Sequence, residues 1–457
     1  MELRIDRQAL VPVVQQIVDA LACWLRQSDI VPGTRLPSAR QIARINLLSQ
    51  SSVVEACDRL VAQGVLASRQ GTGFIVAAPT LAVDSPWLEG TAPQPANVAA
   101  ELRLGCGGLP ESWRETDDLT YAIREVSRTD MAALFNYSSP QGLPALRQHI
   151  IKRLSLLDIA VDEHRVMTTA GASQGLDLIV RALLKPGDCV VVESPGYSLL
   201  FELLRQQGVA MLEVPRTPRG PDVGALEALL LENKPRALFI NSFYHNPTGS
   251  NLAPVVAKQV LHLAKEHDVQ VIEDDVYADL HSGPGTRLAA LDDNVIYVGS
   301  FSKTLSSSLR VGFIVGGAEV ISQLAEVKRI SSLGASGFCE SVLACLLDSG
   351  AYRKLVLRLR QRLRHDREAA LQVLEDAEWE VFGKPVGGLF IWARPRKCDY
   401  AHLRAQARRL GVLLSSATAF SPAGTATDWQ RINVACACDP RARAFFQATA
   451  SDRPQAF

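Results

Sequence analysis

From about residue 100 onward, short apolar runs alternate with amphipathic stretches long enough to form helices. Four of these runs have the length and composition of buried strands: 189–193, 237–241, 269–273 and 295–299. Parallel strands need a crossover connection between neighbours, and that connection is usually a helix. The alternation therefore predicts an α/β fold with a largely parallel sheet over residues 100–457.

Composition divides the rest of the chain. Residues 1–78 contain eight arginines, six acidic residues and no lysine, so this segment is mildly positive. Residues 79–99 contain four prolines and little periodicity, which is typical of a linker. A chain of 457 residues is also longer than one ordinary domain. We therefore expect an N-terminal domain over 1–78, a linker over 79–99 and a larger domain over 100–457.

The overall charge and the cysteines restrict where such a protein works. With 48 basic and 48 acidic residues the formal net charge is zero, so binding to nucleic acid must come from a local patch. The nine cysteines include no CxxC pair, and Cys436 and Cys438 fit one face of a strand better than a metal site. We expect no metal. The chain has neither a signal peptide nor an apolar run that could span a bilayer, so we expect a soluble protein in a reducing cytoplasm.

Three short helices and a hairpin are predicted in the N-terminal segment. The first helix has an apolar face, formed by Val13, Ile17, Leu21, Trp24 and Leu25. Ser38 and Gln41 form a capping box that opens a second helix over 39–45, and a third helix runs from about 49–52 to 63. A glycine-rich tip over 69–73 joins the strands 65–68 and 74–77. This order predicts a winged helix-turn-helix, whose third helix enters the major groove of DNA.

The strings LPSARQIA and SQSSVVEACDRLVAQGVLASRQGTGFIVA resemble the GntR-type winged helix. The resemblance implies a double-stranded DNA operator as partner, bound by Arg40, Gln50, Ser51, Ser52, Arg69 and Gly71. The family usually has arginine where this chain has Gln50, which removes a phosphate or guanine contact. A small helical module for dimerisation, with solvated arginines, is the alternative.

Lys303 lies in the string SFSKTL, directly after the predicted strand 295–299. A lysine at a strand end among hydroxyl groups can form a Schiff base, and Ser300 and Arg310 nearby can bind a phosphate. Asp274 ends another apolar run, where a carboxylate can keep a pyridine nitrogen protonated, as pyridoxal phosphate chemistry requires. Tyr277, three residues further on, can donate to the phenolic oxygen of that cofactor.

Four further motifs extend the constellation. Asn246, in HNPTG, can share the phenolic oxygen, and the glycine-rich string GASQG over 171–175 opens a helix whose backbone amides favour a phosphate. Tyr197 offers an aromatic face for stacking, or else is a core tyrosine. Arg431, in a predicted alternating strand over 430–435, either binds a carboxylate bidentately or is an exposed strand arginine.

In this order the motifs resemble the fold type I aminotransferases over about residues 100–450. The resemblance implies a large mixed sheet with a smaller C-terminal α/β subdomain, a Schiff base between Lys303 and pyridoxal 5′-phosphate, and Arg431 on a substrate carboxylate. The implied cofactor-binding residues are Ala172, Ser173, Gln174, Tyr197, Asn246, Asp274, Tyr277, Ser300, Ser302 and Arg310. Tyr137 would reach the phosphate of a neighbouring subunit, which implies a homodimer. Ser307 and Ser308 replace the Pro-Gly that the family commonly has.

A GntR-type winged helix joined to an aminotransferase-like domain is the architecture of the MocR group of regulators. It implies a transcription regulator that senses pyridoxal phosphate, an amino compound as external aldimine, or both. An active class I/II aminotransferase carrying a DNA-binding module remains open, as does a dimerisation scaffold without chemistry. We favour the sensor, because a fused DNA-binding domain serves catalysis poorly.

Overall fold

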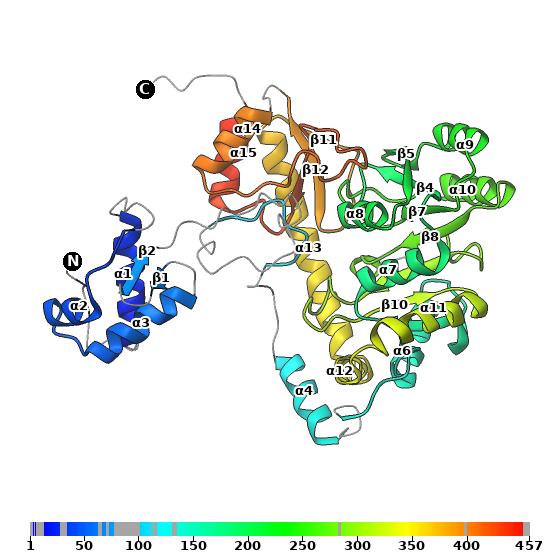
Figure 1. Ribbon diagram of the computed structural model, residues 1–457. Helices are drawn as coiled ribbons and strands as arrows, with labels where there is room; N and C mark the ends of the chain where they lie inside the picture. The colour runs from blue at the N-terminus through cyan, green and yellow to red at the C-terminus, as the bar shows by residue number, and fades with distance from the viewer. Residues whose placement is uncertain are drawn as a thin grey trace. The chain divides into compact units, whose positions relative to one another are not determined.

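The computed structural model describes residues 3, 5, 13–27, 34–62, 66–69, 73–76, 101–110, 113, 117–129, 135–281, 285–396 and 400–450. The chain falls into two compact units, Met1–Ala100 and Glu101–Phe457 (Figure 1). The predicted linker lies outside the described residues, so its bounds stay a prediction. Within the described part, no helix has the length and apolar character needed to cross a membrane.

The N-terminal unit has the predicted order of elements: α1 (Val13–Gln27), α2 (Ala39–Ile45), α3 (Gln50–Ala62), β1 (Leu66–Arg69) and β2 (Gly73–Val76). β1 and β2 pair antiparallel, with Leu66 opposite Val76. The capping box is present, since the Gln41 amide N–H donates to the Ser38 hydroxyl and the Ser38 N–H donates to the Gln41 side chain. Buried Ile17, Leu21 and other apolar side chains of the three helices form the core. Of the predicted hairpin tip over 69–73, residues 70–72 lie outside the described residues, and Arg69 and Gly73 belong to the two strands.

An eight-stranded sheet organises the larger unit, in the order β3-β10-β9-β8-β7-β4-β5-β6. Its strands are β3 (Val166–Thr169), β4 (Cys189–Ser194), β5 (Ala210–Thr217), β6 (Gly220–Pro221), β7 (Ala237–Asn241), β8 (Gln270–Asp274), β9 (Ile296–Ser300) and β10 (Gly312–Val315). The four predicted strands are β4, β7, β8 and β9, within one residue at each end. The inner strands from β9 to β5 are parallel, whereas β10 is antiparallel to both β9 and β3. The sheet is therefore mixed. The chain reverses direction between β9 and β10, so these neighbouring strands pair antiparallel.

Helices cover both faces of this sheet. One face packs on α7 (Ala172–Leu183), α8 (Ser198–Gln206) and α11 (Ala318–Ser332). The other packs on α6 (Pro144–Ser155), α9 (Val223–Glu232), α10 (Pro254–Glu266), α12 (Gly337–Asp348) and α13 (Ala351–Asp376). Neighbouring residues of one strand point to opposite clusters, as Val190 and Val191 do. Burial on both faces explains why the strands are uninterrupted apolar runs in the sequence.

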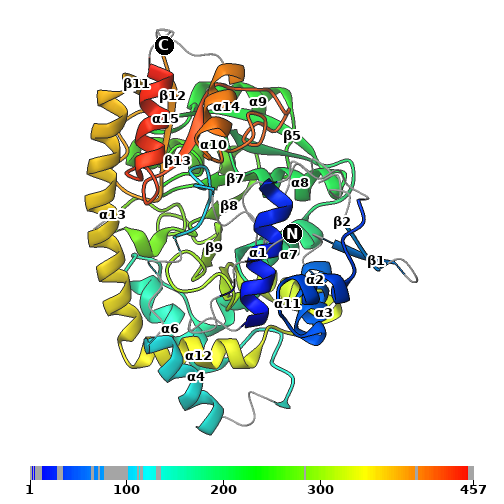
Figure 2. The same ribbon diagram turned by 90° about the vertical axis from the view of Figure 1, so that its left-hand side faces the viewer.

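A smaller antiparallel sheet completes the unit, in the order β11 (Trp379–Val381), β12 (Phe390–Pro395) and β13 (Gln430–Asn433). It lies with α14 (Tyr400–Arg409) and α15 (Pro440–Ala450), while α4 (Asp117–Thr129) packs against α12. The 3-10 turns are η4 (Glu163–Arg165) and η5 (Ala278–Leu280). Figure 2 shows α13 along one edge of the unit, from α15 at one end to α12 at the other.

The predicted strand over 430–435 is two residues too long. β13 ends at Asn433, whose side-chain oxygen accepts from the Ala435 N–H and starts a run of turns. Cys436 and Cys438 lie in these turns, so their predicted place on one strand face is wrong.

Candidate cofactor site and DNA-binding surface

Most of the predicted cofactor-binding residues gather at the carboxyl ends of the parallel strands. Tyr197 follows β4, Asn246 follows β7, Asp274 ends β8 and Lys303 follows β9. Parallel strands expose their carboxyl ends at one edge of the sheet, and ligands of open α/β sheets bind there. The apolar runs form the strands, and the strands bring together polar residues that are far apart in the sequence.

The Lys303 amine is enclosed by the site. Its Nζ donates to the carbonyl oxygen of Gly107 at 2.9 Å and lies 5.9 Å from the centre of the Tyr277 ring. Burial, and then the positive charge of Arg431, lower the pKa of Lys303 to about 8, although Asp274 opposes the shift. Near neutral pH the unprotonated amine, the form that attacks a carbonyl carbon, is therefore much more abundant than for an ordinary lysine.

Asp274 is a partly buried carboxylate without an ion-pair partner among the described residues. Its Oδ1 accepts from the Val276 N–H at 3.3 Å, and its backbone oxygen accepts from the Asn241 amide at 2.6 Å. Burial raises the pKa of Asp274 to about 7. A protonated pyridine nitrogen beside this carboxylate would supply the missing positive charge, so Asp274 fits a pyridoxal ring.

Arg310 and the first turn of α7 form an anion-binding cradle. The Arg310 guanidinium donates to the Ser302 hydroxyl at 3.3 Å and to the Ala170 carbonyl at 3.2 Å. Gly171 precedes α7 with φ of 82°, and a Cβ added there would lie 2.3 Å from Nη2 of Arg310. Ala172 is the first residue of α7, so the free N–H groups of the helix face the same place. The absence of a side chain at Gly171 keeps the cradle open for a phosphate.

The other predicted phosphate and ring ligands have their own partners. Ser300 accepts a hydrogen bond from the Ser302 N–H at 3.1 Å, and Ser173 is hydrogen-bonded to Tyr197. Burial, and then the charge of Asp274, raise the pKa of Tyr197 to about 12, so its hydroxyl stays protonated. Gln174 accepts from the Ala170 N–H at 2.7 Å and donates to the Ser332 hydroxyl at 3.3 Å. These contacts shape the turn before α7.

Arg431 is buried, with 8% of its surface exposed, so the alternative of an exposed strand arginine is wrong. Its guanidinium donates to Oδ1 of Asn246 at 2.8 Å and to the Gly105 carbonyl at 2.7 Å. The rings of Phe390 and Phe420 lie 4.7 and 4.9 Å from it. No ion pair in the described part of the chain involves Arg431, so a ligand carboxylate would be its missing counter-charge.

Asn246 and Tyr277, the predicted donors to the phenolic oxygen, both interact with Arg431. Oδ1 of Asn246 accepts from Arg431, which leaves its amide nitrogen as the group that can donate to a phenolic oxygen. Tyr277 is buried and packs edge-on against Phe390. Burial raises the pKa of Tyr277, so this hydroxyl also stays a donor.

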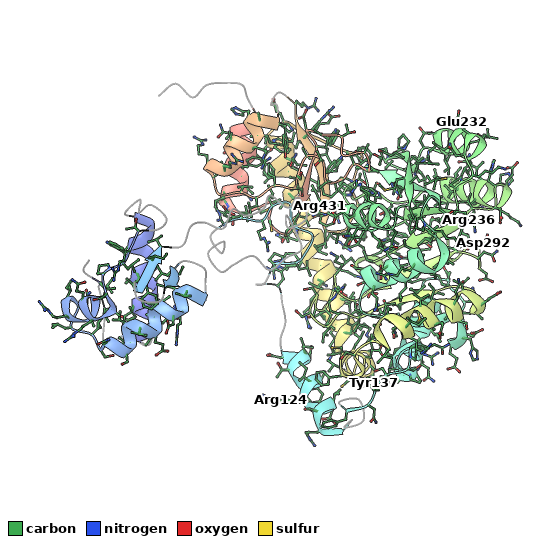
Figure 3. All side chains as sticks on the ribbon, in the orientation of Figure 1. Arg124, Tyr137, Glu232, Arg236, Asp292 and Arg431 are labelled. Atoms are coloured by element: carbon green, nitrogen blue, oxygen red, sulfur yellow. The ribbon has the colours of Figure 1, made fainter. Side chains whose placement is uncertain are left out.

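Tyr137 is the one predicted cofactor ligand that the chain does not bring to the others. Its side chain is 89% exposed. Figure 3 shows Tyr137 near α12, in a different part of the larger unit from Arg431. Its predicted role toward a second subunit stays a prediction.

Sequence reasoning missed a loop that bonds to both cationic groups of the site. This loop, residues 105–108, accepts from Arg431 through Gly105 and from Lys303 through Gly107. Asn433 donates to the carbonyls of Cys106 and Gly108 at 3.1 and 2.7 Å. The loop contributes backbone oxygens, which a search for side-chain motifs does not detect. The glycine-rich string GCGG was the one sequence feature that could have indicated it.

The predicted DNA-binding residues that the structure describes lie on α2, at the start of α3 and in β1. Arg40 is exposed on α2, while Gln50, Ser51 and Ser52 form the first turn of α3. Ser49 orders that turn, since its hydroxyl bonds to Ser52 at 2.7 Å and accepts from the Ser52 N–H at 3.0 Å. Arg69 lies in β1, and its side chain and Gly71 are outside the described residues.

Comparison with known proteins places both units in families. Residues 101–444 match the family "Aminotransferase class I and II", and residues 13–76 match "Bacterial regulatory proteins, gntR family". The chain is 29% identical over 421 residues to the uncharacterized HTH-type transcriptional regulator YisV of Bacillus subtilis, covering 85% of each protein. It is 34% identical over 299 residues to 2-aminoadipate transaminase of Thermus thermophilus, covering 63% of this chain and 73% of that protein.

The fold agrees with solved aminotransferases. LysN, the alpha-aminoadipate aminotransferase of Thermus thermophilus complexed with N-(5′-phosphopyridoxyl)-L-leucine, superposes with a TM-score of 0.70 at 27% identity. The match covers 76% of this chain and 92% of LysN. Together with the unpaired Asp274 and the open cradle at Gly171, this likeness supports pyridoxal phosphate as the cofactor. The chain belongs to the aminotransferase class I and II family, with an N-terminal gntR-family domain in the arrangement of the MocR-type regulators.

Proposed function

We propose that this protein is a DNA-binding transcription regulator that binds pyridoxal phosphate through Lys303 and senses an amino compound with a carboxylate. The observation that carries the proposal is that a partly buried amine, Lys303, and a buried guanidinium, Arg431, bond to the same loop, in a chain that also has a winged helix. We propose the division 1–78, 79–99 and 100–457, with a cytoplasmic location because the operator DNA lies there.

Each residue of the site has a definite task in this proposal. When bound, pyridoxal phosphate would supply an electrophilic aldehyde carbon, and Lys303 is the amine that would hold it. Asp274 would keep the ring nitrogen protonated, Asn246 and Tyr277 would donate to the phenolic oxygen, and Tyr197 would stack on the ring. The phosphate would be held by Ala172, Ser173, Gln174, Ser300, Ser302 and Arg310. The Lys303 amine could hold a proton whenever it is free of the cofactor.

Arg431 selects the ligand. Its guanidinium is buried between two aromatic rings and lacks a carboxylate partner among the described residues, so a ligand carboxylate gains a charge-assisted bidentate bond. Gly105 accepts from Nε and Nη2 of Arg431, so a carboxylate that takes this edge of the guanidinium displaces the Gly105 carbonyl. Binding therefore changes the contacts of the loop 105–108, which comes after the predicted linker in the sequence.

A homodimer is part of the proposal. The support is that Tyr137 is exposed. A residue that completes the phosphate site of a second copy must be exposed in the single chain. On the DNA side, exposed Arg40 would bind a phosphate, and Gln50, Ser51 and Ser52 would meet base edges at the start of α3.

An active aminotransferase is the second candidate. It is favoured by the 34% identity to a transaminase and by the gathering of Lys303, Asp274, Asn246, Tyr277 and Arg310 at one site. The two candidates differ in the fate of the bound ligand, since a sensor stops at the bound state and a transaminase releases a keto acid.

Visible absorption spectra of the purified full chain, titrated with a panel of amino acids and no keto acid, separate the candidates. A cofactor band that shifts and persists is expected for the sensor. Loss of the band with release of keto acid and pyridoxamine phosphate would favour the enzyme. Lys303→Ala should lose the lysine-bound band, whereas Lys185→Ala, on the surface after α7, should keep it. A band that survives in Lys303→Ala would refute the assignment.

A further inference from the structure

Two cysteine thiols meet at the edge of the cofactor site. Cys106 lies in the loop 105–108, and Cys436 lies in the turns after β13. Asn433 connects the two, since its carbonyl accepts from the Cys436 N–H at 3.0 Å and its side-chain amide donates to Sγ of Cys106 at 3.4 Å; the two thiols interact electrostatically. Both thiols are half-buried rather than sealed in the core. A small solute can therefore approach the pair.

The loop is anchored on both sides of Cys106. Gly105 accepts from Arg431 and Gly107 accepts from Lys303, while Asn433 donates to the Cys106 carbonyl. Cys106 is thus held toward the segment that carries Cys436.

The surroundings give the two sulfur atoms different chemical roles. The pKa of Cys106 is lowered, first by the hydrogen bond from Cys436, then by the Gly108 backbone, the Asn433 amide and the charge of Arg431. The Lys303 amine also faces Cys106. The hydrogen bond to Cys106 and burial raise the pKa of Cys436. The Asn433 amide and the positive charge of Arg431 favour the thiolate of Cys106, so Cys106 is the attacking sulfur in our proposal and Cys436 is the resolving thiol.

We propose that Cys106 and Cys436 form a hydroperoxide-responsive thiol pair beside the ligand site. The Cys106 sulfur attacks one oxygen of the hydroperoxide, the O–O bond breaks, and an alcohol (water, from hydrogen peroxide) leaves with a proton. This leaves a sulfenic acid on Cys106. The Cys436 sulfur then attacks the Cys106 sulfur, the S–O bond breaks, and the hydroxide leaves as water with the Cys436 proton. The two cysteines lose two electrons together, and the peroxide gains them.

The disulfide would tether the loop that a ligand must move. A carboxylate that takes the Nε and Nη2 edge of Arg431 displaces the Gly105 carbonyl, and a cofactor bonded to Lys303 would remove the ammonium that donates to Gly107. Tying Cys106 to Cys436 opposes both changes. The oxidised protein therefore binds carboxylate-bearing amines more weakly; this consequence rests on the proposed function, whereas the disulfide does not.

Peroxide titration of the reduced full chain, with thiol counting and peptide mapping of the products, tests the pair. The expected product is a reducible Cys106–Cys436 crosslink. Cys436→Ser should stop at a sulfenic acid on Cys106, which a cyclic diketone traps, and Cys106→Ser should give neither product. Cys345→Ser is the control: burial raises the pKa of the Cys345 thiol, so this variant should behave as the parent protein. A crosslink that is absent, or that joins other cysteines, overturns the proposal.

Amino-acid binding to the cofactor-loaded protein, measured by absorbance, tests the consequence. We expect binding about 10-fold weaker after oxidation, restored by dithiothreitol, and no such change when Cys106→Ser is treated with peroxide. Equal affinity in the two redox states would refute control of the ligand site and leave the crosslink standing. If the reduced protein binds no amino compound, the proposed function fails, and the peptide map alone decides the thiol pair.

Discussion

Lys303 and Arg431 are bonded to the same short loop, two residues apart: Nζ of Lys303 lies 2.9 Å from the Gly107 oxygen, and Nη2 of Arg431 lies 2.7 Å from the Gly105 oxygen. A Cβ added to Gly107 would lie 3.7 Å from Nη2 of Arg431 and 3.8 Å from Nζ of Lys303. The loop carbonyls thus bond to the two cationic side chains that a cofactor and a ligand carboxylate would use. A ligand that takes the Nε and Nη2 edge of Arg431 competes with the loop.

The lowered pKa of Lys303 predicts how pyridoxal phosphate capture depends on pH. The unprotonated amine is the nucleophile, so the capture rate should rise up to about pH 8 and then level off. With an unperturbed lysine, the capture rate would keep rising up to about pH 10.4. The measurement is the rate at which the lysine-bound band appears after the cofactor-free protein is mixed with pyridoxal phosphate.

Arg431→Gln checks the cause of this pH dependence. The Arg431 charge lowers the pKa of Lys303, so the midpoint should move upward in the variant. Arg394→Gln removes a half-exposed arginine paired with Glu380 and should leave the midpoint unchanged. A midpoint near that of free lysine in the parent protein would contradict the enclosed site.

Asp274→Asn should stabilise the cofactor-free protein and weaken the cofactor-bound one. The folded pKa of about 7 lies above the unfolded value of about 3.9, so the folded state binds more protons between these values and loses stability as pH rises. At pH 8 we expect the variant to gain about 1–3 kcal/mol without cofactor, and less at pH 5. Its gain from added pyridoxal phosphate should shrink, because the ring nitrogen loses its counter-charge.

Thermal unfolding with and without pyridoxal phosphate at the two pH values measures this effect. Asp275→Asn is the matched control, since Asp275 is paired with Arg287 at 2.6 Å. Breaking that buried pair should cost about 3–5 kcal/mol with or without cofactor. Destabilisation of both variants alike would show that Asp274 is a structural carboxylate.

Arg431→Gln should weaken amino acids far more than the corresponding amines. Loss of the guanidinium removes a buried charge-assisted bond to a carboxylate, so amino-acid affinity should fall about 30-fold or more, or about 2 kcal/mol. The decarboxylated amine should be nearly unaffected. Absorbance titration of both compounds gives the ratio, and equal losses for the two would argue against carboxylate recognition.

Gly171→Ala should damage phosphate binding specifically. The added Cβ would lie 2.3 Å from Nη2 of Arg310, at a residue with φ of 82°. Gly187→Ala is a close control, since its φ is 92° and its added Cβ meets no atom within 4 Å. Both variants should lose about 1–2 kcal/mol of stability from the left-handed backbone. Only Gly171→Ala should lose pyridoxal phosphate affinity, by about 10-fold, as measured by equilibrium dialysis.

Arg40→Ala should weaken DNA binding and its dependence on salt. A lost phosphate contact lowers the slope of log affinity against log salt by about 0.9. Arg59→Ala, on the exposed face of α3 and paired with Glu55 at 2.8 Å, should keep the parent slope. Fluorescence anisotropy with a duplex from upstream of the gene gives both slopes. Identical slopes for the parent and Arg40→Ala would remove this residue from the interface.

Features that depend on neighbours along the chain could be read from the sequence. The capping box of Ser38 and Gln41 joins residues three apart, and the buried strands are continuous apolar runs, so both were directly predictable. Once the strands are parallel, their carboxyl ends share an edge, and the gathering of Asp274 and Lys303 is a consequence. The DNA contacts and the role of Tyr137 stay predictions, because they involve other molecules.

Features that depend on contacts between distant segments required the folded chain. Burial of Arg431, the reversed direction of β10, the bond of Lys303 to Gly107 and the meeting of Cys106 with Cys436 leave no periodic signal in the sequence. They arise from backbone carbonyls and from packing between residues far apart along the chain. A residue's type says which bonds it can make, and the tertiary structure decides which partners are within reach.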